Sequence, residues 1–187
     1  RDATLGRSPE AEAELKRSSD FTLPDDYAGR LTRLARSLHQ AGDYAAAEPL
    51  LRKVIELRRQ AFGETSPEYA DSLNDLATLA VDLGDYASAE RHYVRALEIL
   101  EADGSKHAMT LGVTLHNLGV LYERMEQFER AEPFLRRDLE LVEQTLGPNR
   151  PEFAHSLASL AFLKCRRGKL EEGTELYRQA LTLYQSL

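Results

Sequence analysis

A pattern that returns every 42 residues constrains the fold of this chain more than any other feature. It begins with four leucines, Leu31, Leu73, Leu115 and Leu157. Small residues then recur at two positions of each unit: Ala35, Ala77, Gly119 and Ala161 at the first, and Ala47, Ala89, Ala131 and Gly173 at the second. Fixed-period similarity is typical of stacked repeats, in which each unit buries its apolar face against its neighbours.

Each unit is predicted to contain two antiparallel helices. Pro67 and Pro151 precede segments of helical periodicity, where a proline at the first position loses no hydrogen bond. Gly42, Gly84 and Gly168 are expected to end the first helix in a left-handed conformation. The small residues favour close helix crossings. We therefore expect a leader or short capping helix at 1–23 and a repeat domain at 24–187, with hairpins at about 24–66, 67–108, 109–150 and 151–187.

Two residues of the third unit depart from the repeat. Glu126 stands where the other units have a turn glycine, so it is expected to adopt a positive φ at a cost of about 1 kcal/mol. Asp138 stands where the other units have Val54, Ala96 and Ala180. A carboxylate inside a helix interface needs a partner or water. We expect Asp138 to pair with Arg124 or an arginine of an adjacent repeat, or the third unit to be locally loosened.

Composition narrows the class of protein. The 187 residues are 42% hydrophobic and 29% charged, as expected of one globular domain, and the net charge of −7 argues against general binding to nucleic acid or anionic membranes. No apolar run is long enough for a membrane span. The single cysteine, Cys165, favours a cytoplasmic location. The chain starts without methionine and stops inside a helical pattern, so we expect a fragment of a longer protein.

The repeat resembles a known family. Segments such as "LNDLATLAVDLGDYASAE" and "LHNLGVLYERMEQFERAEPFL" are similar to tetratricopeptide repeats, and the long unit looks most like those of kinesin light chains and related bacterial proteins. The resemblance covers residues 31–187. It implies an all-α, right-handed α-solenoid of stacked antiparallel helix hairpins.

The resemblance also implies a peptide-binding groove, because the first helices of tetratricopeptide repeats line the concave face. The positions carried onto this sequence are Thr32, Arg33, Arg36, His39, Asn74, Thr78, His116, Asn117, Val120, Arg124, His155 and Phe162. Asparagine can satisfy a peptide backbone, arginine pairs with carboxylates, and valine or phenylalanine forms apolar pockets. Kinesin light chains take acidic peptides, but Asp75, Asp82 and Glu123 interrupt the positive charge here.

No group of residues predicts catalysis, a metal site or a cofactor. His116 and His155 are expected to approach one another from adjacent first helices. Cys165, however, lies ten residues beyond His155, or about 15 Å along the helix, which is too far for a shared metal. No histidine is spaced to activate the thiol.

Two functions remain open from the sequence. The first is a non-enzymatic scaffold that binds a peptide segment of a partner protein in the concave groove. The second is a regulatory or assembly domain of a larger signalling or effector protein, which acts through its ends or convex face. Leu181, Leu183, Tyr184 and Leu187 are expected to form an apolar edge that another helix covers or that associates with a second copy.

Overall fold

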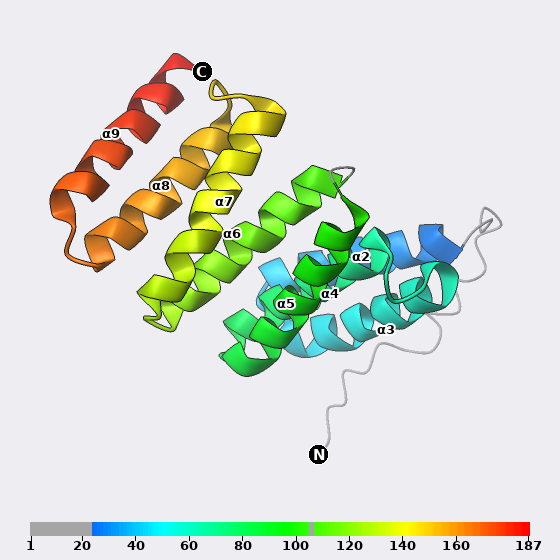
Figure 1. Ribbon diagram of the computed structural model, residues 1–187. Coiled ribbons are helices and arrows are strands. Elements are labelled where there is room, and N and C mark those ends of the chain that lie inside the picture. Colours follow the sequence, from blue (N-terminus) through cyan, green and yellow to red (C-terminus); the bar gives the residue numbers. More distant parts are fainter. Residues whose placement is uncertain (1–23, 105–106) are drawn as a thin grey trace.

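Helical hairpins follow one another along the chain in the computed structural model, which describes residues 24–104 and 107–187 (Figure 1). Those residues form eight helices and no strand. The helices are α2 (Pro24–Gln40), α3 (Tyr44–Phe62), α4 (Pro67–Asp82), α5 (Tyr86–Asp103), α6 (Ala108–Arg124), α7 (Phe128–Leu146), α8 (Pro151–Arg166) and α9 (Leu170–Ser186). The all-α repeat fold expected from the sequence is confirmed. The expected leader at 1–23 lies outside the described residues.

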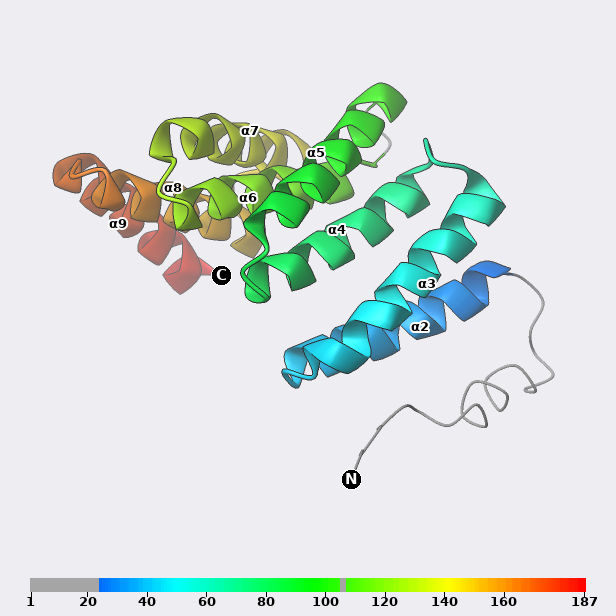
Figure 2. The same ribbon diagram turned by 90° about the horizontal axis from the view of Figure 1, so that it is seen from below.

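The stack has an inner and an outer side. The second helix of each hairpin packs against the first helix of the next, α3 on α4, α5 on α6 and α7 on α8. Successive first helices, α2, α4, α6 and α8, also contact one another, and no two second helices of the described chain do so to the same extent. The arrangement is visible from below in Figure 2. Because the first helices approach more closely, they line the inner side of the stack.

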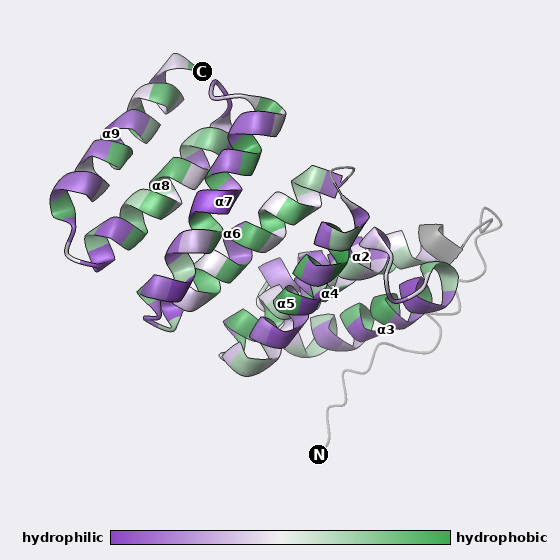
Figure 3. Ribbon diagram, viewed as in Figure 1, coloured by the Kyte–Doolittle hydropathy of each residue, from purple (hydrophilic) through white to green (hydrophobic). Residues whose placement is uncertain are grey.

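The prolines and glycines expected at helix ends do lie at helix ends. Pro67 and Pro151 open α4 and α8, and Gly42, Gly84 and Gly168 have φ values of 79°, 80° and 77°. Each helix carries hydrophilic and hydrophobic residues (Figure 3), as expected of helices with one buried face. The largest core cluster joins α4 to α8 and contains Leu115, Leu118 and Leu121, none more than 1% exposed. No helix in the described part of the chain combines the length and apolarity needed to cross a membrane.

Glu126 adopts the predicted left-handed conformation. Its φ is 58°, its N–H donates to Glu123 O at 2.9 Å, and the next N–H, of Gln127, donates to Tyr122 O at 2.8 Å. This is the turn that glycine makes in the other three hairpins. The Glu126 side chain also accepts from Arg166 at 3.0 Å, but it is 73% exposed, so this ion pair contributes little.

Glu126→Gly is expected to raise the free energy of unfolding by about 0.5 kcal/mol. Relief of left-handed strain, about 1 kcal/mol, is partly offset by the greater freedom of glycine in the unfolded chain. The converse substitution, Gly84→Ala, is the control and should cost about 1 kcal/mol at an equivalent turn. Urea denaturation measures both. A destabilising Glu126→Gly would mean that the exposed ion pair outweighs the strain.

Candidate functional site

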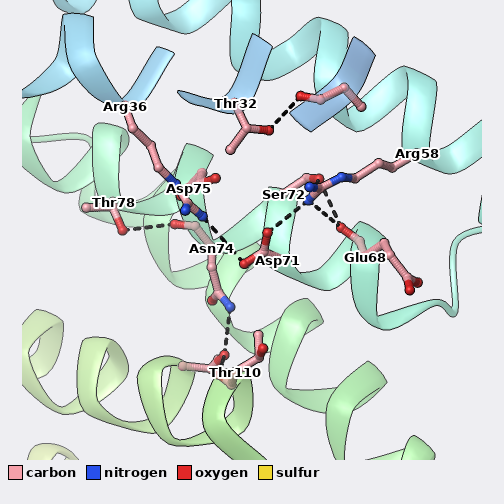
Figure 4. Close-up of polar contacts among 12 residues, drawn as sticks. Thr32, Arg36, Arg58, Glu68, Asp71, Ser72, Asn74, Asp75, Thr78 and Thr110 are labelled. Atoms are coloured by element: carbon pink, nitrogen blue, oxygen red, sulfur yellow. Dashed lines mark hydrogen bonds and ion pairs between the residues drawn. The ribbon is translucent and has the colours of Figure 1, made fainter. Parts of the chain in front are cut away.

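Several predicted groove residues in the first half of the stack lie between helices rather than on the surface. Thr32 and Asn74 are only 4% and 5% exposed. The Thr32 hydroxyl donates to Ala28 O at 2.9 Å, and the Asn74 amide donates from α4 to the Thr114 hydroxyl of α6 at 2.8 Å. Figure 4 shows Asn74 directed toward α6. The Thr32 hydroxyl bonds within α2, whereas the Asn74 amide joins α4 to α6. Neither donor group is available to a ligand in this arrangement.

Two predicted basic residues of the same half, Arg36 and His39, are paired with carboxylates of a neighbouring first helix. Arg36 on α2 donates to Asp75 on α4 at 2.8 Å (Figure 4), and His39 contacts Asp82 at 2.7 Å. Arg124 reaches the same Asp82 from α6 at 3.5 Å. Burial raises the pKa of Asp75, although the hydrogen bond from Arg36 opposes the shift. The acidic residues that interrupt the expected basic groove thus neutralise it by linking successive repeats.

The remaining groove candidates vary in exposure. Arg33 and Phe162 are exposed, and Val120 is half-buried. The Thr78 hydroxyl forms a hydrogen bond with the Tyr93 hydroxyl at 2.8 Å. His116, Asn117 and His155 all line a pocket in the second half of the stack.

That pocket lies between the third and fourth hairpins. It has a volume of about 430 Å³ and lies where the beginning of α6, the end of α7 and the beginning of α8 meet, with Tyr184 of α9 at its margin. The accessible surface of its walls is mainly apolar. The apolar lining residues are Ala108, Met109, Gly112, Val113, Leu141, Val142, Leu146 and Pro151. Met109, Val113 and Tyr184 are 57%, 52% and 47% exposed, so they form an apolar rim at the opening.

Asp138 forms the polar floor of the pocket. Its side chain, on α7, is 4% exposed, and its Oδ2 accepts from the Ser156 hydroxyl at 2.7 Å and contacts His116 Nδ1 at 3.2 Å. The predicted arginine partner is therefore wrong. Serine and histidine from the two flanking first helices satisfy this oxygen instead, because Asp138 points between α6 and α8 and not toward the turn that carries Arg124.

The two histidines meet at the same place, as the sequence predicts. The rings of His116 and His155 have centroids 4.8 Å apart. Burial, followed by the proximity of His116, lowers the pKa of His155 below its ordinary value of 6.5. Near pH 7 His155 is therefore mainly uncharged. No group of three or more metal-ligating side chains occurs among the described residues.

One register position in the pocket wall holds a smaller residue than the equivalent positions of the two preceding hairpins. The position is occupied by Arg58 in the first hairpin, Leu100 in the second and Val142 in the third. Arg58 is buried and its Nη1 donates to Ser72 Oγ and Glu68 O, both at 3.0 Å (Figure 4). Leu100 is completely buried. Valine does not fill the equivalent space, so the third junction stays open.

The sequence pointed to the histidines of this pocket but not to its walls. The departure of Asp138 from the repeat was a usable signal that a polar group enters an interface at this point. The change from arginine to leucine to valine was also visible at the 42-residue register. Whether this change opens a pocket depends on how the three helices pack together, and the spacing of residues along the chain does not show how they pack.

The stacked hairpins and their inner pocket define an α-solenoid of the helical repeat class. The chain belongs to the tetratricopeptide repeat family, whose sequence profile matches residues 27–102 and 110–186. Proteins of this family are generally scaffolds for protein–protein interaction, and that is the functional class of this chain. No curated protein matches the sequence.

Solved structures of similar fold include kinesin light chain-like proteins. BtubC (BKLC) from P. vanneervenii superposes with a TM-score of 0.78 at 22% identity, over 95% of this chain and 73% of that one. A variant of a putative kinesin light chain with nearly identical TPR-like repeats from P. anserina gives 0.73 at 19% identity, over 93% and 82%. Aspartyl phosphate phosphatase F from Bacillus subtilis gives 0.77 at 19% identity, over 88% and 42%. At these identities the likeness shows the fold.

Proposed function

We propose that this chain captures a peptide segment of a partner protein on its inner surface, with one side chain of the peptide anchored in the pocket between α6, α7 and α8. The observation that carries the proposal is the pocket itself. Its volume of about 430 Å³ falls within the range of ligand-binding cavities, and its aliphatic walls end in a small number of polar groups. This combination supports an anchor residue with a defined orientation.

The surroundings of the pocket support a peptide. Asn117 lines the pocket, and its side-chain amide offers both a hydrogen-bond donor and an acceptor to an extended peptide backbone. Val113 and Met109 leave apolar surface exposed on the same helix, which a bound segment would cover. Phe162, on α8, is 45% exposed and provides a second apolar contact farther along the inner side.

Val142→Leu is expected to reduce capture of the partner by about tenfold, because leucine fills the space an anchor side chain needs. The substitution places in the third hairpin the residue that the second already has at this register, Leu100, so the fold should tolerate it. The measurement is affinity capture from a lysate of the source cells, with mass spectrometry of the bound proteins.

The matched control is Val94→Leu, the same chemical change on α5, outside the pocket. Asn117→Ala and Phe162→Ala extend the test to the rest of the inner surface. Equal recovery of all partners by wild type and Val142→Leu, with unchanged helical circular dichroism, would exclude the pocket as the anchor site.

A second candidate function is a regulatory or assembly role through the end of the solenoid. The observation in its favour is a set of exposed apolar residues on and beside α9, namely Leu170, Tyr177, Leu181, Tyr184 and Leu187. Such a surface fits another helix or a second copy of the chain. Under this alternative, Leu181→Lys would release the partner and Val142→Leu would not. A cytoplasmic location stays a prediction, supported by the lone Cys165.

A further inference from the structure

One oxygen of the buried Asp138 is left without a partner at the floor of the pocket. Both interactions of this carboxylate, with Ser156 and with His116, use Oδ2. Among the described residues none donates a hydrogen bond to Oδ1, although only 3% of Asp138 is exposed and the residue lines the pocket. Oδ1 is not one of the fully buried polar atoms of the described residues that lack a partner, so it is reached from the pocket. A donor from a ligand can therefore pair with this oxygen there.

Gly112 is the reason that Oδ1 is uncovered. A Cβ on Gly112 would lie 3.5 Å from this oxygen and 3.8 Å from Leu141 Cδ2. The equivalent positions of the other three repeats hold alanine, at Ala28, Ala70 and Ala154. Among the four units, only the third has an aspartate at the register position of Asp138, and it is also the only one without a methyl group at the position of Gly112.

The charge and the walls of the pocket select the ligand. Two carboxylates, Asp138 and Glu152, line it, and no lysine or arginine does so within the described ranges. The other titratable groups that face it are His116, His155 and Tyr184. The pocket wall beside the Asp138 carboxylate also contains the aliphatic side chains of Leu141, Val142 and Leu146. A cation at the end of an aliphatic stem complements both features.

We propose that the pocket takes the side chain of a lysine from the partner peptide, with its ammonium group donating to Asp138 Oδ1. This inference rests on the peptide-capture function proposed above and names the anchor residue. Arginine fits less well. A guanidinium binds carboxylates best through two parallel hydrogen bonds to both oxygens, and Oδ2 already has two partners. An ammonium is a compact donor that needs only one oxygen.

The test uses four blocked five-residue peptides with alanine on both sides of a central lysine, arginine, norleucine or acetyl-lysine. Each is titrated at about pH 8, above the ordinary pKa of histidine, while NMR follows the methyl groups of Val113 and Val142. The lysine peptide should bind at least about tenfold more tightly than the norleucine peptide, because a charge-assisted hydrogen bond is lost in the latter. Arginine should lie between them.

Two variants test the role of the carboxylate. Asp138→Asn should remove the preference for lysine over norleucine, and Gly112→Ala should weaken lysine binding by placing a methyl group beside Oδ1. If Asp138→Asn fails to fold, Gly112→Ala decides, since its methyl group meets only ordinary contacts. Lysine and norleucine peptides of equal affinity, a preference that survives both variants, or no response of the pocket methyls to any peptide would each overturn the inference. Peptide capture would still stand if Val142→Leu releases the partner.

Discussion

Gly173→Ala is expected to lower the free energy of unfolding by about 1–3 kcal/mol, although the change adds one methyl group and favours helix formation. Gly173 lies on α9 where this helix crosses α8. A Cβ at this position would overlap Cys165 Sγ and would lie 2.9 Å from Ala161 O and 3.1 Å from Cys165 N. The cysteine side chain can rotate away. The two backbone atoms belong to α8, so the helices themselves must separate.

The expected cost depends on how closely the two helices of this hairpin approach one another, compared with the helices of the other hairpins. The first two hairpins have alanine at both small positions, whereas the third has Gly119 with Ala131 and the fourth has Ala161 with Gly173. At Gly119 a Cβ would lie 2.5 Å from Leu135 Cγ. One glycine in each of the last two hairpins therefore lets their helices approach more closely than two alanines would.

Gly112→Ala is the matched control for the stability of Gly173→Ala. It is also a helical glycine, but an added methyl group meets its neighbours no closer than 3.5 Å. Alanine should therefore stabilise the protein there by up to about 1 kcal/mol through its higher helix propensity. Urea denaturation followed by circular dichroism measures both variants. If both substitutions stabilise, α8 and α9 can separate at little cost and close packing is not what retains Gly173.

The sequence predicts the residues that act within one repeat much better than those that act between repeats. Hairpin boundaries follow from local signals such as Pro67 and Gly84, and the small residues follow from the register. Asn74 looked like a groove residue because it lies on the expected inner helix. It is buried because its amide reaches Thr114, which is 40 residues away in the sequence.

The sequence could not predict the pocket for a related reason. A cavity is the volume that three helices leave unfilled, so it depends on side-chain sizes and on the angles between the helices together. The register shows that Val142 is smaller than Leu100, but not whether neighbouring side chains move in to fill the difference. Similarly, the charge of Asp138 called for a partner, and only the fold decides between the nearby arginines and the flanking Ser156 and His116.

The sequence also does not predict a buried ion pair that joins the third and fourth hairpins. Glu132 on α7 accepts from Lys164 on α8 at 2.7 Å, and the lysine side chain is only 4% exposed. The equivalent contact one repeat earlier has an uncharged donor: the Tyr122 hydroxyl donates to Glu90 at 2.9 Å, and Arg130 pairs with the same Glu90 oxygen at 2.6 Å. Glutamate thus returns at the 42-residue register, while its partner changes from tyrosine to lysine. The contact joins the third and fourth hairpins, which form the pocket.

Glu132→Ala is expected to lower the free energy of unfolding by about 3 kcal/mol, because it leaves the ammonium of Lys164 buried without its main partner. Glu172, at 3.0 Å from Lys164 Nζ, compensates only in part, since its side chain is 53% exposed. Thermal and urea denaturation measure the effect. The double variant Glu132→Ala with Lys164→Leu should recover most of the loss, because Leu38 occupies the equivalent position of the first repeat. A double variant as unstable as the single one would show that Glu132 acts through other groups.

Acid provides an independent test of the same carboxylate. Burial alone would raise the pKa of Glu132, but hydrogen bonds from Lys164 and Arg136 outweigh it and lower the pKa from 4.5 to about 2. A carboxyl group whose pKa is lowered by folding stabilises the native state fully above pH 4.5 and loses this contribution as the pH falls toward 2. Wild type should therefore lose more stability over this interval than Glu132→Gln, which cannot titrate. Parallel pH profiles would mean that Glu132 has the same pKa in the folded and unfolded chains, and the ion pair would then contribute nothing to holding the third and fourth hairpins together.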